Sequence, residues 1–127
     1  DPMGILWHGR YAPLFEQANE ELGRACGMRN PDFRREKVAA PIVQLHVDYF
    51  APVSLGETVT IIGRMRWCEG ARINIEYEIR RQDGALAATG YTVQMFVDET
   101  GAALLASPPL LDACRRRWKS NELDNLK

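Results

Sequence analysis

Apolar residues recur every three or four positions over residues 11–26 and predict an amphipathic helix. The apolar positions are Tyr11, Leu14, Phe15, Ala18, Leu22 and Ala25. Pro13 is compatible with a first helical turn, and Gly27 follows the last periodic residue, where a glycine commonly ends a helix. One face of this helix is therefore expected to cover a hydrophobic core.

From about residue 40 the hydrophobic period changes from 3.6 to 2, which predicts β-strands. The expected strands cover residues 43–49, 58–67, 72–80, 85–97 and, as a short last strand, 102–106. Asp83-Gly84 is a strong hairpin signal between two of them. Pro31 and the charged residues 34–37 indicate a loop, and Pro108-Pro109 introduces a last helix over about 109–118.

The order of these elements predicts an α+β fold, in which the first helix lies on a sheet of about five antiparallel strands. Each strand is expected to follow its predecessor in a meander. The strands are longer than usual, so the sheet should curve around the helix. The opposite face of the sheet is polar, and His46 is expected there as a surface or interface residue.

Composition is that of one globular domain over residues 1–127, with 46% hydrophobic and 26% charged residues. A formal net charge of -1 argues against a nucleic-acid partner, and no apolar run is long enough for a membrane span. Cys26, Cys68 and Cys114 are scattered and lack the spacing of a metal site, so no metal is expected. Scattered thiols favour a reducing, cytoplasmic location.

The first eleven residues carry the candidate chemistry, because an acid, a glycine turn, two aromatic residues and a histidine lead directly into the helix. The N-terminus of a helix presents N–H groups without intrahelical partners, which can polarise a carbonyl oxygen. A carboxylate beside it can act as a nucleophile or as a base on water. This arrangement is suited to attack on a carbonyl group.

The segment Asp1-Pro2-Met3-Gly4-Ile5-Leu6-Trp7-His8-Gly9-Arg10-Tyr11 resembles the active-site segment of the 4-hydroxybenzoyl-CoA thioesterase family, which has the hot-dog fold. The hairpin segment Tyr49-Phe50-Ala51-Pro52-Val53, followed by Gly56-Glu57, is similar to a hairpin of the same family. The resemblance covers nearly the whole chain. It implies a hot-dog domain that hydrolyses an acyl-CoA or acyl-carrier-protein thioester without a cofactor.

The resemblance also implies a role for each residue of the segment. Asp1 matches the catalytic carboxylate, and His8 matches the residue whose backbone N–H binds the thioester oxygen. Gly4 matches the glycine that lets the loop approach the substrate, and Trp7 and Tyr11 match aromatic positions near the acyl group.

Two further substrate-binding residues are expected from the resemblance. Ala40-Pro41-Ile42-Val43 resembles the strand that follows the helix, and we assign Pro41 to substrate binding on that ground. Some family members bind the phosphates of CoA through arginines in the turn between the two central strands, where this chain offers only Arg72. An acyl-carrier-protein substrate therefore stays open beside acyl-CoA.

Hot-dog sites form between subunits, so the resemblance implies a homodimer or a homotetramer built as a dimer of dimers. Family members usually carry a strand before the catalytic acid, and that strand is expected upstream of Asp1. Two alternatives stay open: a hydroxyacyl-thioester dehydratase, which would use the His8 imidazole, and a non-catalytic acyl-thioester binding protein.

Overall fold

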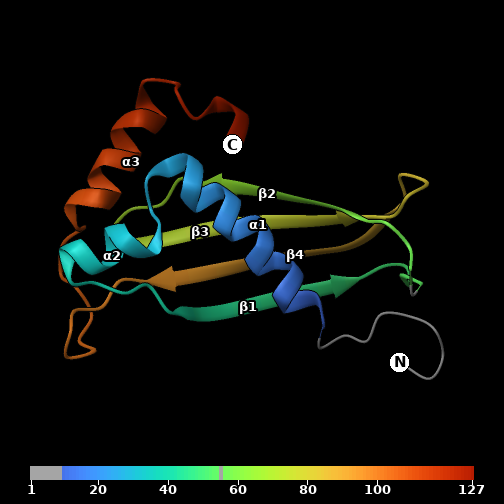
Figure 1. Cartoon of the computed structure of the whole chain (residues 1–127), viewed down its shortest axis with the longest axis horizontal. Helices are drawn as coiled ribbons and strands as arrows, with labels where there is room; N and C mark the ends of the chain where they lie inside the picture. Colours follow the sequence, from blue (N-terminus) through green and yellow to red (C-terminus); the bar gives the residue numbers. More distant parts are fainter. Residues whose placement is uncertain (1–9, 55) are drawn as a thin grey trace.

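The computed structural model describes residues 10–54 and 56–127. In this part of the chain, helices α1 (Tyr11–Cys26) and α2 (Asn30–Glu36) precede strands β1 (Ile42–Tyr49), β2 (Thr60–Arg66), β3 (Arg72–Arg80) and β4 (Leu86–Met95). Helix α3 (Pro109–Lys119) and the short 3-10 helix η2 (Asp124–Leu126) follow. Helix α1 crosses one face of the sheet, and α2 and α3 gather near one end of it (Figure 1). The helix predicted over residues 11–26 and the α+β class are confirmed.

The four strands form one antiparallel sheet in the order β1-β4-β3-β2. Strand β1 pairs with β4, with Val47 opposite Gly90, so the predicted meander is wrong at its first step. The residues that follow β1 explain this strand order. The N–H groups of Phe50 and Ala51 both donate to the carbonyl of Ala87, at 2.8 and 3.1 Å. These bonds hold the chain against β4 where a tight turn would have led to β2.

The fifth strand predicted at residues 102–106 is wrong, and the described sheet has four strands in place of about five. The Asp98 carboxylate accepts hydrogen bonds from the N–H groups of Thr100 and Ala102, at 2.8 and 3.1 Å, which closes a tight turn. Ala103 then makes a single bridge to Val97. Leu105 is fully exposed, because the chain has left the sheet before a ladder can form.

The loop predicted around Pro31 is also wrong, because Asn30–Glu36 forms α2. Pro31 lies in the first turn, where its missing N–H costs nothing. The Asp32 carboxylate accepts from the backbone N–H of Arg29 and from the Arg35 guanidinium, both at 2.9 Å. None of the described helices is both long and apolar enough to cross a membrane.

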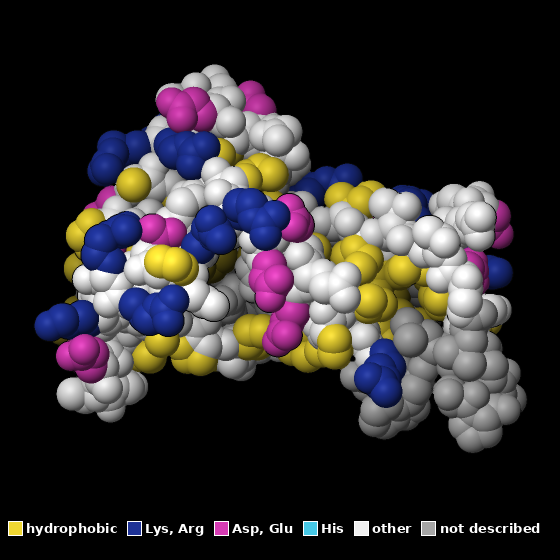
Figure 2. Space-filling view, viewed as in Figure 1, with side chains coloured by type: hydrophobic (Ala, Val, Ile, Leu, Met, Phe, Trp, Pro, Cys, Tyr) yellow, Lys and Arg dark blue, Asp and Glu magenta, His cyan; other side chains and the backbone are white. Residues whose placement is uncertain are grey.

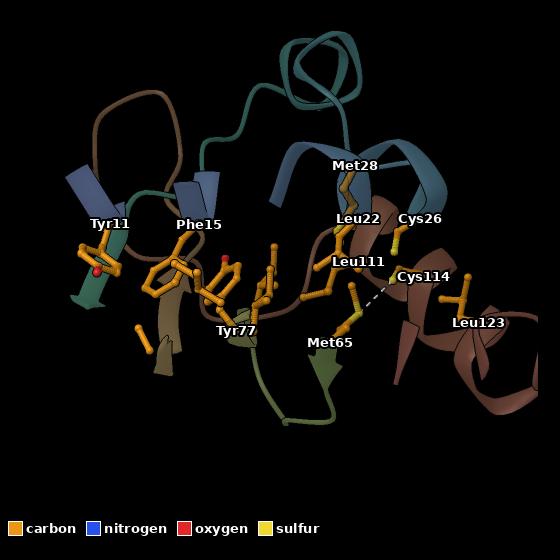
Figure 3. Close-up of a cluster of buried hydrophobic side chains, with 14 of the residues drawn as sticks. Tyr11, Phe15, Leu22, Cys26, Met28, Met65, Tyr77, Leu111, Cys114 and Leu123 are labelled. Atoms are coloured by element: carbon orange, nitrogen blue, oxygen red, sulfur yellow. Dashed lines mark hydrogen bonds between the residues drawn. The ribbon is translucent and has the colours of Figure 1, made fainter. Parts of the chain in front are cut away.

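The hydrophobic core lies between α1 and the inner face of the sheet (Figure 3). The Phe15 ring stacks on Tyr77 with centroids 4.5 Å apart. A Cβ atom on Gly90 would lie 2.6 Å from the Phe15 ring, so this close approach of helix and strand requires glycine. Near the end of α1 the core is closed by α3, through Leu22, Cys26, Met65, Leu111 and Cys114.

Candidate functional site

Four of the predicted site residues, Asp1, Gly4, Trp7 and His8, lie outside the described residues. Their roles stay predictions. The other three, Tyr11, Pro41 and Arg72, are described, and they fix where the ends of the candidate site lie.

Tyr11 begins α1 and lies against the end of β1. Its ring is buried and meets Tyr49 edge to face, with centroids 4.8 Å apart. Burial, and then the neighbouring Tyr49, raises the pKa of the Tyr11 phenol. Arg10 holds the N-cap position, and no side chain in the described residues caps the first turn. Helix α1 therefore begins beside the C-terminal end of β1.

Pro41 and Arg72 lie at the opposite end of the sheet. The carbonyl of Pro41 accepts from the N–H of Met95 at 3.2 Å, and Met95 pairs with Arg72, the first residue of β3. Strand β1 has eight residues and separates Pro41 from Tyr49 by roughly 26 Å. A single chain thus brings Pro41 and Arg72 together but leaves Tyr11 at the other end of the sheet.

A large cavity opens at the end of the sheet that carries Pro41. Its volume is about 820 Å³, and it lies between α1, α2 and the inner face of the sheet. Ala40 and Ile42, the neighbours of Pro41, line it, and so do Ile73 and Ile75 on β3. The surface is visibly hollowed between α1 and α2 (Figure 2). The size is that of a small-molecule site.

A pair of amide side chains lies in the cavity wall, and the sequence analysis missed it. Asn19 on α1 donates through Nδ2 to Oε1 of Gln94 on β4, at 3.0 Å. Gln94 donates in turn through Nε2 to the carbonyl of Ala40, at 2.8 Å. Gln94 pairs with Ile73 on one side and with Ile42 on the other, so it is the polar member of an apolar row. An amide at an inward position of a strand was the signal available in the sequence.

Arg72 lies beside a cationic and aromatic surface formed with α3. The Arg115 guanidinium and the Lys119 ammonium lie 5.7 and 5.4 Å from the centroid of the Trp67 ring. Arg72 and Trp67 line the same small crevice under α3. The described residues include no group of acidic, histidine or cysteine side chains able to hold a metal ion.

Strand β1 forms an apolar edge of the sheet. It pairs with β4 on one side, and no described residue pairs with it on the other. Val43 and Leu45 are 50% and 48% exposed, and Ile42 and Tyr49 are exposed to a similar extent. An exposed apolar edge strand is a template for pairing with another strand.

The family model of the thioesterase-like superfamily matches residues 1–116. YneP of Bacillus subtilis, a candidate acyl-CoA thioesterase, is 25% identical over 99 residues, which cover 78% of this chain and 72% of that protein.

Two solved structures from Staphylococcus aureus are also similar. A DHNA-CoA thioesterase is 28% identical with a TM-score of 0.76, over 98% of this chain and 85% of that chain. A second protein, solved in complex with CoA, is 17% identical with a TM-score of 0.81, over 93% and 75% of the two chains. At 17% identity this second likeness shows the fold alone. Together with the family match, these structures confirm the predicted fold class.

Proposed function

The chain belongs to the thioesterase-like superfamily, and from this premise we propose that it is an acyl-CoA thioesterase, which hydrolyses a thioester to a free acid and a thiol. The main support for this function is that the family match extends over most of the chain. Residues 1–116 include the Asp1–Tyr11 segment, the helix that follows it and the whole sheet. Two of the similar proteins are named as CoA thioesterases or as candidates for that activity.

In the proposed mechanism, Asp1 supplies the carboxylate and the backbone N–H of His8 binds the thioester oxygen. The carboxylate either takes a proton from the attacking water or adds to the carbonyl itself to form an anhydride. The oxyanion develops against the start of α1, where the helix dipole is favourable and no described side chain competes for the N–H groups. The thiolate then leaves and takes up a proton; on the second route this completes the anhydride, which water hydrolyses to release the free acid and restore the Asp1 carboxylate.

The active enzyme is proposed to be a dimer joined along β1. Two β1 strands that pair antiparallel about a two-fold axis bury their apolar edges against each other. The same pairing sets the Tyr49 end of one strand beside the Ile42 end of the other. The segment before Tyr11 in one subunit then meets Pro41 and the cavity of its partner, which completes a site that one chain leaves divided.

Arg72 is proposed to contact the nucleotide end of CoA, with Arg115 and Lys119 supplying positive charge beside it. Positive charge in this place suits the phosphates of CoA. The cysteines Cys26, Cys68 and Cys114 are free thiols, which is consistent with the cytoplasmic location that we propose.

The function is tested by thiol release from a panel of aliphatic and aromatic acyl-CoAs. Asp1→Asn should lower kcat on the order of 10²–10⁴-fold, because it removes the base or nucleophile and leaves the fold intact. Glu99→Gln, at an exposed acid in the turn after β4, is the matched control and should keep full activity. Equal rates for Asp1→Asn and the unmodified protein would disprove the mechanism.

The dimer is tested by light scattering. Val43→Glu places like charges across the proposed β1 interface and should give an inactive monomer. Leu105→Glu makes the same change at a fully exposed residue away from the sheet, and should leave both assembly and turnover unchanged. An active Val43→Glu monomer would mean that one chain holds the whole site.

A further inference from the structure

We propose that Cys26 and Cys114 form a dithiol site that reacts with peroxide, which converts the two thiols to a reversible disulfide between α1 and α3. Cys26 is the last residue of α1, and Cys114 lies in the middle of α3. Both side chains are buried, and their sulfur atoms face each other in the core (Figure 3). This dithiol site takes no part in the proposed thioester hydrolysis, and its test does not depend on that activity.

The two thiols and a neighbouring thioether form a chain of sulfur contacts. The Cys114 thiol donates to Sδ of Met65 on β2, at 3.7 Å. Because its proton is directed to Met65, Cys26 is the donor in the hydrogen bond between Cys26 and Cys114. Two thiols that already point toward each other are in the arrangement from which a disulfide can form without a large movement of the backbone.

The surroundings favour a thiolate on Cys114 rather than on Cys26. The hydrogen bond from Cys26 is the main cause that lowers the pKa of Cys114. The guanidinium groups of Arg117 and Arg115 act in the same direction, against the effect of burial. The same hydrogen bond, and then burial, raises the pKa of Cys26. Cys114 is therefore the nucleophile, and Cys26 is the second thiol.

A small oxidant can reach Cys114 through the crevice under α3. Cys114 lines this crevice together with Trp67 and the half-buried Cys68. The crevice has a volume of about 20 Å³, which is room for one molecule of the size of water. Hydrogen peroxide is larger than water by only one oxygen atom. The Cys68 thiol is turned to another partner, since it donates to the carbonyl of Arg72 at 3.3 Å.

The reaction uses one molecule of hydrogen peroxide as the oxidant. The Cys114 thiolate attacks one peroxide oxygen, the O–O bond breaks, and the departing hydroxide takes up a proton to become water. Cys114 is then a sulfenic acid. The Cys26 sulfur attacks the Cys114 sulfur, the S–O bond breaks, and the Cys26 proton leaves with the hydroxyl group as a second water. The two thiols lose two electrons, and the peroxide gains them.

The disulfide should stabilise the fold as a whole. It closes a long loop that contains α2 and all four described strands, and a cross-link across such a loop restricts the unfolded chain. In the folded protein α3 is already held at the end of α1, because Arg117 Nη1 donates to the carbonyl of Ala25 at 2.8 Å. We expect the oxidised protein to have a Tm higher by roughly 5 °C or more.

The experiment treats the unmodified protein with hydrogen peroxide and maps the products by mass spectrometry without reduction. The expected product has lost two hydrogen atoms and contains a peptide pair linked through Cys26 and Cys114. Its raised Tm should return to the original value with dithiothreitol. Cys68→Ala is the matched control, because it removes the third thiol, which lines the same crevice, and it should form the same disulfide.

Two variants separate the roles of the paired thiols. Cys26→Ala should stop the reaction at a Cys114 sulfenic acid, which dimedone traps, and Cys114→Ala should leave Cys26 reduced. A sulfenic acid on Cys26 in place of Cys114 would overturn the assignment. So would an unmodified protein in which peroxide oxidises Met65 or Cys68 and leaves Cys26 and Cys114 as thiols. That last result comes from the unmodified protein, so it does not depend on how well the variants fold.

Discussion

The two halves of α1 lie on the same sheet but contact it in different ways. In the first half, Phe15 is 1% exposed, stacks on Tyr77 and touches the backbone of β4 at Gly90. In the second half, Leu22 and Cys26 are buried on the side of β2 and α3. Asn19, on the side of β4, lines the large cavity.

This difference shows how one helix can be both an anchor and the wall of a site. Close packing against Gly90 fixes the height of the helix above the sheet at one end. At the other end the polar pair Asn19–Gln94 spans the gap, and α2 forms the opposite wall. Substitutions at the packed end of α1 should therefore change the stability of the fold, and substitutions at the other end should change the cavity.

The largest effect is expected from Phe15→Ala. Removing a fully buried ring should lower the free energy of unfolding by about 3–5 kcal/mol, through lost burial and the cavity left behind. Chemical denaturation measures this change. Leu14→Ala, at a partly buried position of the same turn, should cost less. A loss of under 1 kcal/mol on the same scale for Phe15→Ala would mean that the first half of α1 is not the anchor.

Gly90→Ala is expected to have the next largest effect. Its Cβ would lie 2.6 Å from both the Phe15 ring and the carbonyl oxygen of His46, so the helix or the strand must move. The expected loss is about 1–3 kcal/mol, read from thermal or chemical unfolding. At Gly63 a Cβ would meet only side chains, at 3.1 and 3.2 Å, so Gly63→Ala should be the milder change. The reverse order would show that β2 limits the packing of α1.

Much of the fold could be predicted because its signals are local. The helix over Tyr11–Cys26 was predicted with its observed bounds, since side-chain period and the terminal glycine are properties of neighbouring residues. The order of the strands could not be predicted in this way, because the hydrogen bonds from Phe50 and Ala51 to Ala87 join segments that are distant in the sequence. Helix α2 was missed because Pro31 was interpreted as a loop signal, although a first turn accepts proline.

Less of the site could be predicted. Asp1, Gly4, Trp7 and His8 follow from a motif, and they lie outside the described residues. Tyr11 and Pro41 were predicted from motifs, but only the sheet shows that they lie at opposite ends of β1. Asn19 and Gln94 are in contact only because α1 crosses β4, and no local sequence pattern predicts where a helix crosses a strand.

The smallest effect is expected at α2, and it depends on pH. The hydrogen bond from the Arg29 N–H, and then the Arg35 side chain, lowers the pKa of Asp32 below its ordinary value of 3.8. The folded state therefore favours the carboxylate. Its stabilising contribution is present above pH 3.8 and is lost as the pH falls through the lowered pKa.

Asp32→Asn should therefore loosen the cavity wall and leave the packed end of α1 unchanged. Hydrogen exchange at neutral pH should be faster for the amides of α2 and unaltered for those around Phe15 and Tyr77. The difference in thermal stability between Asp32→Asn and the unmodified protein should disappear as the solution is acidified, because Asp32 of the unmodified protein then loses its charge as well. Glu99→Gln should show no gap at any pH. Faster exchange around Phe15 would instead mean that the two halves of α1 are coupled through α2.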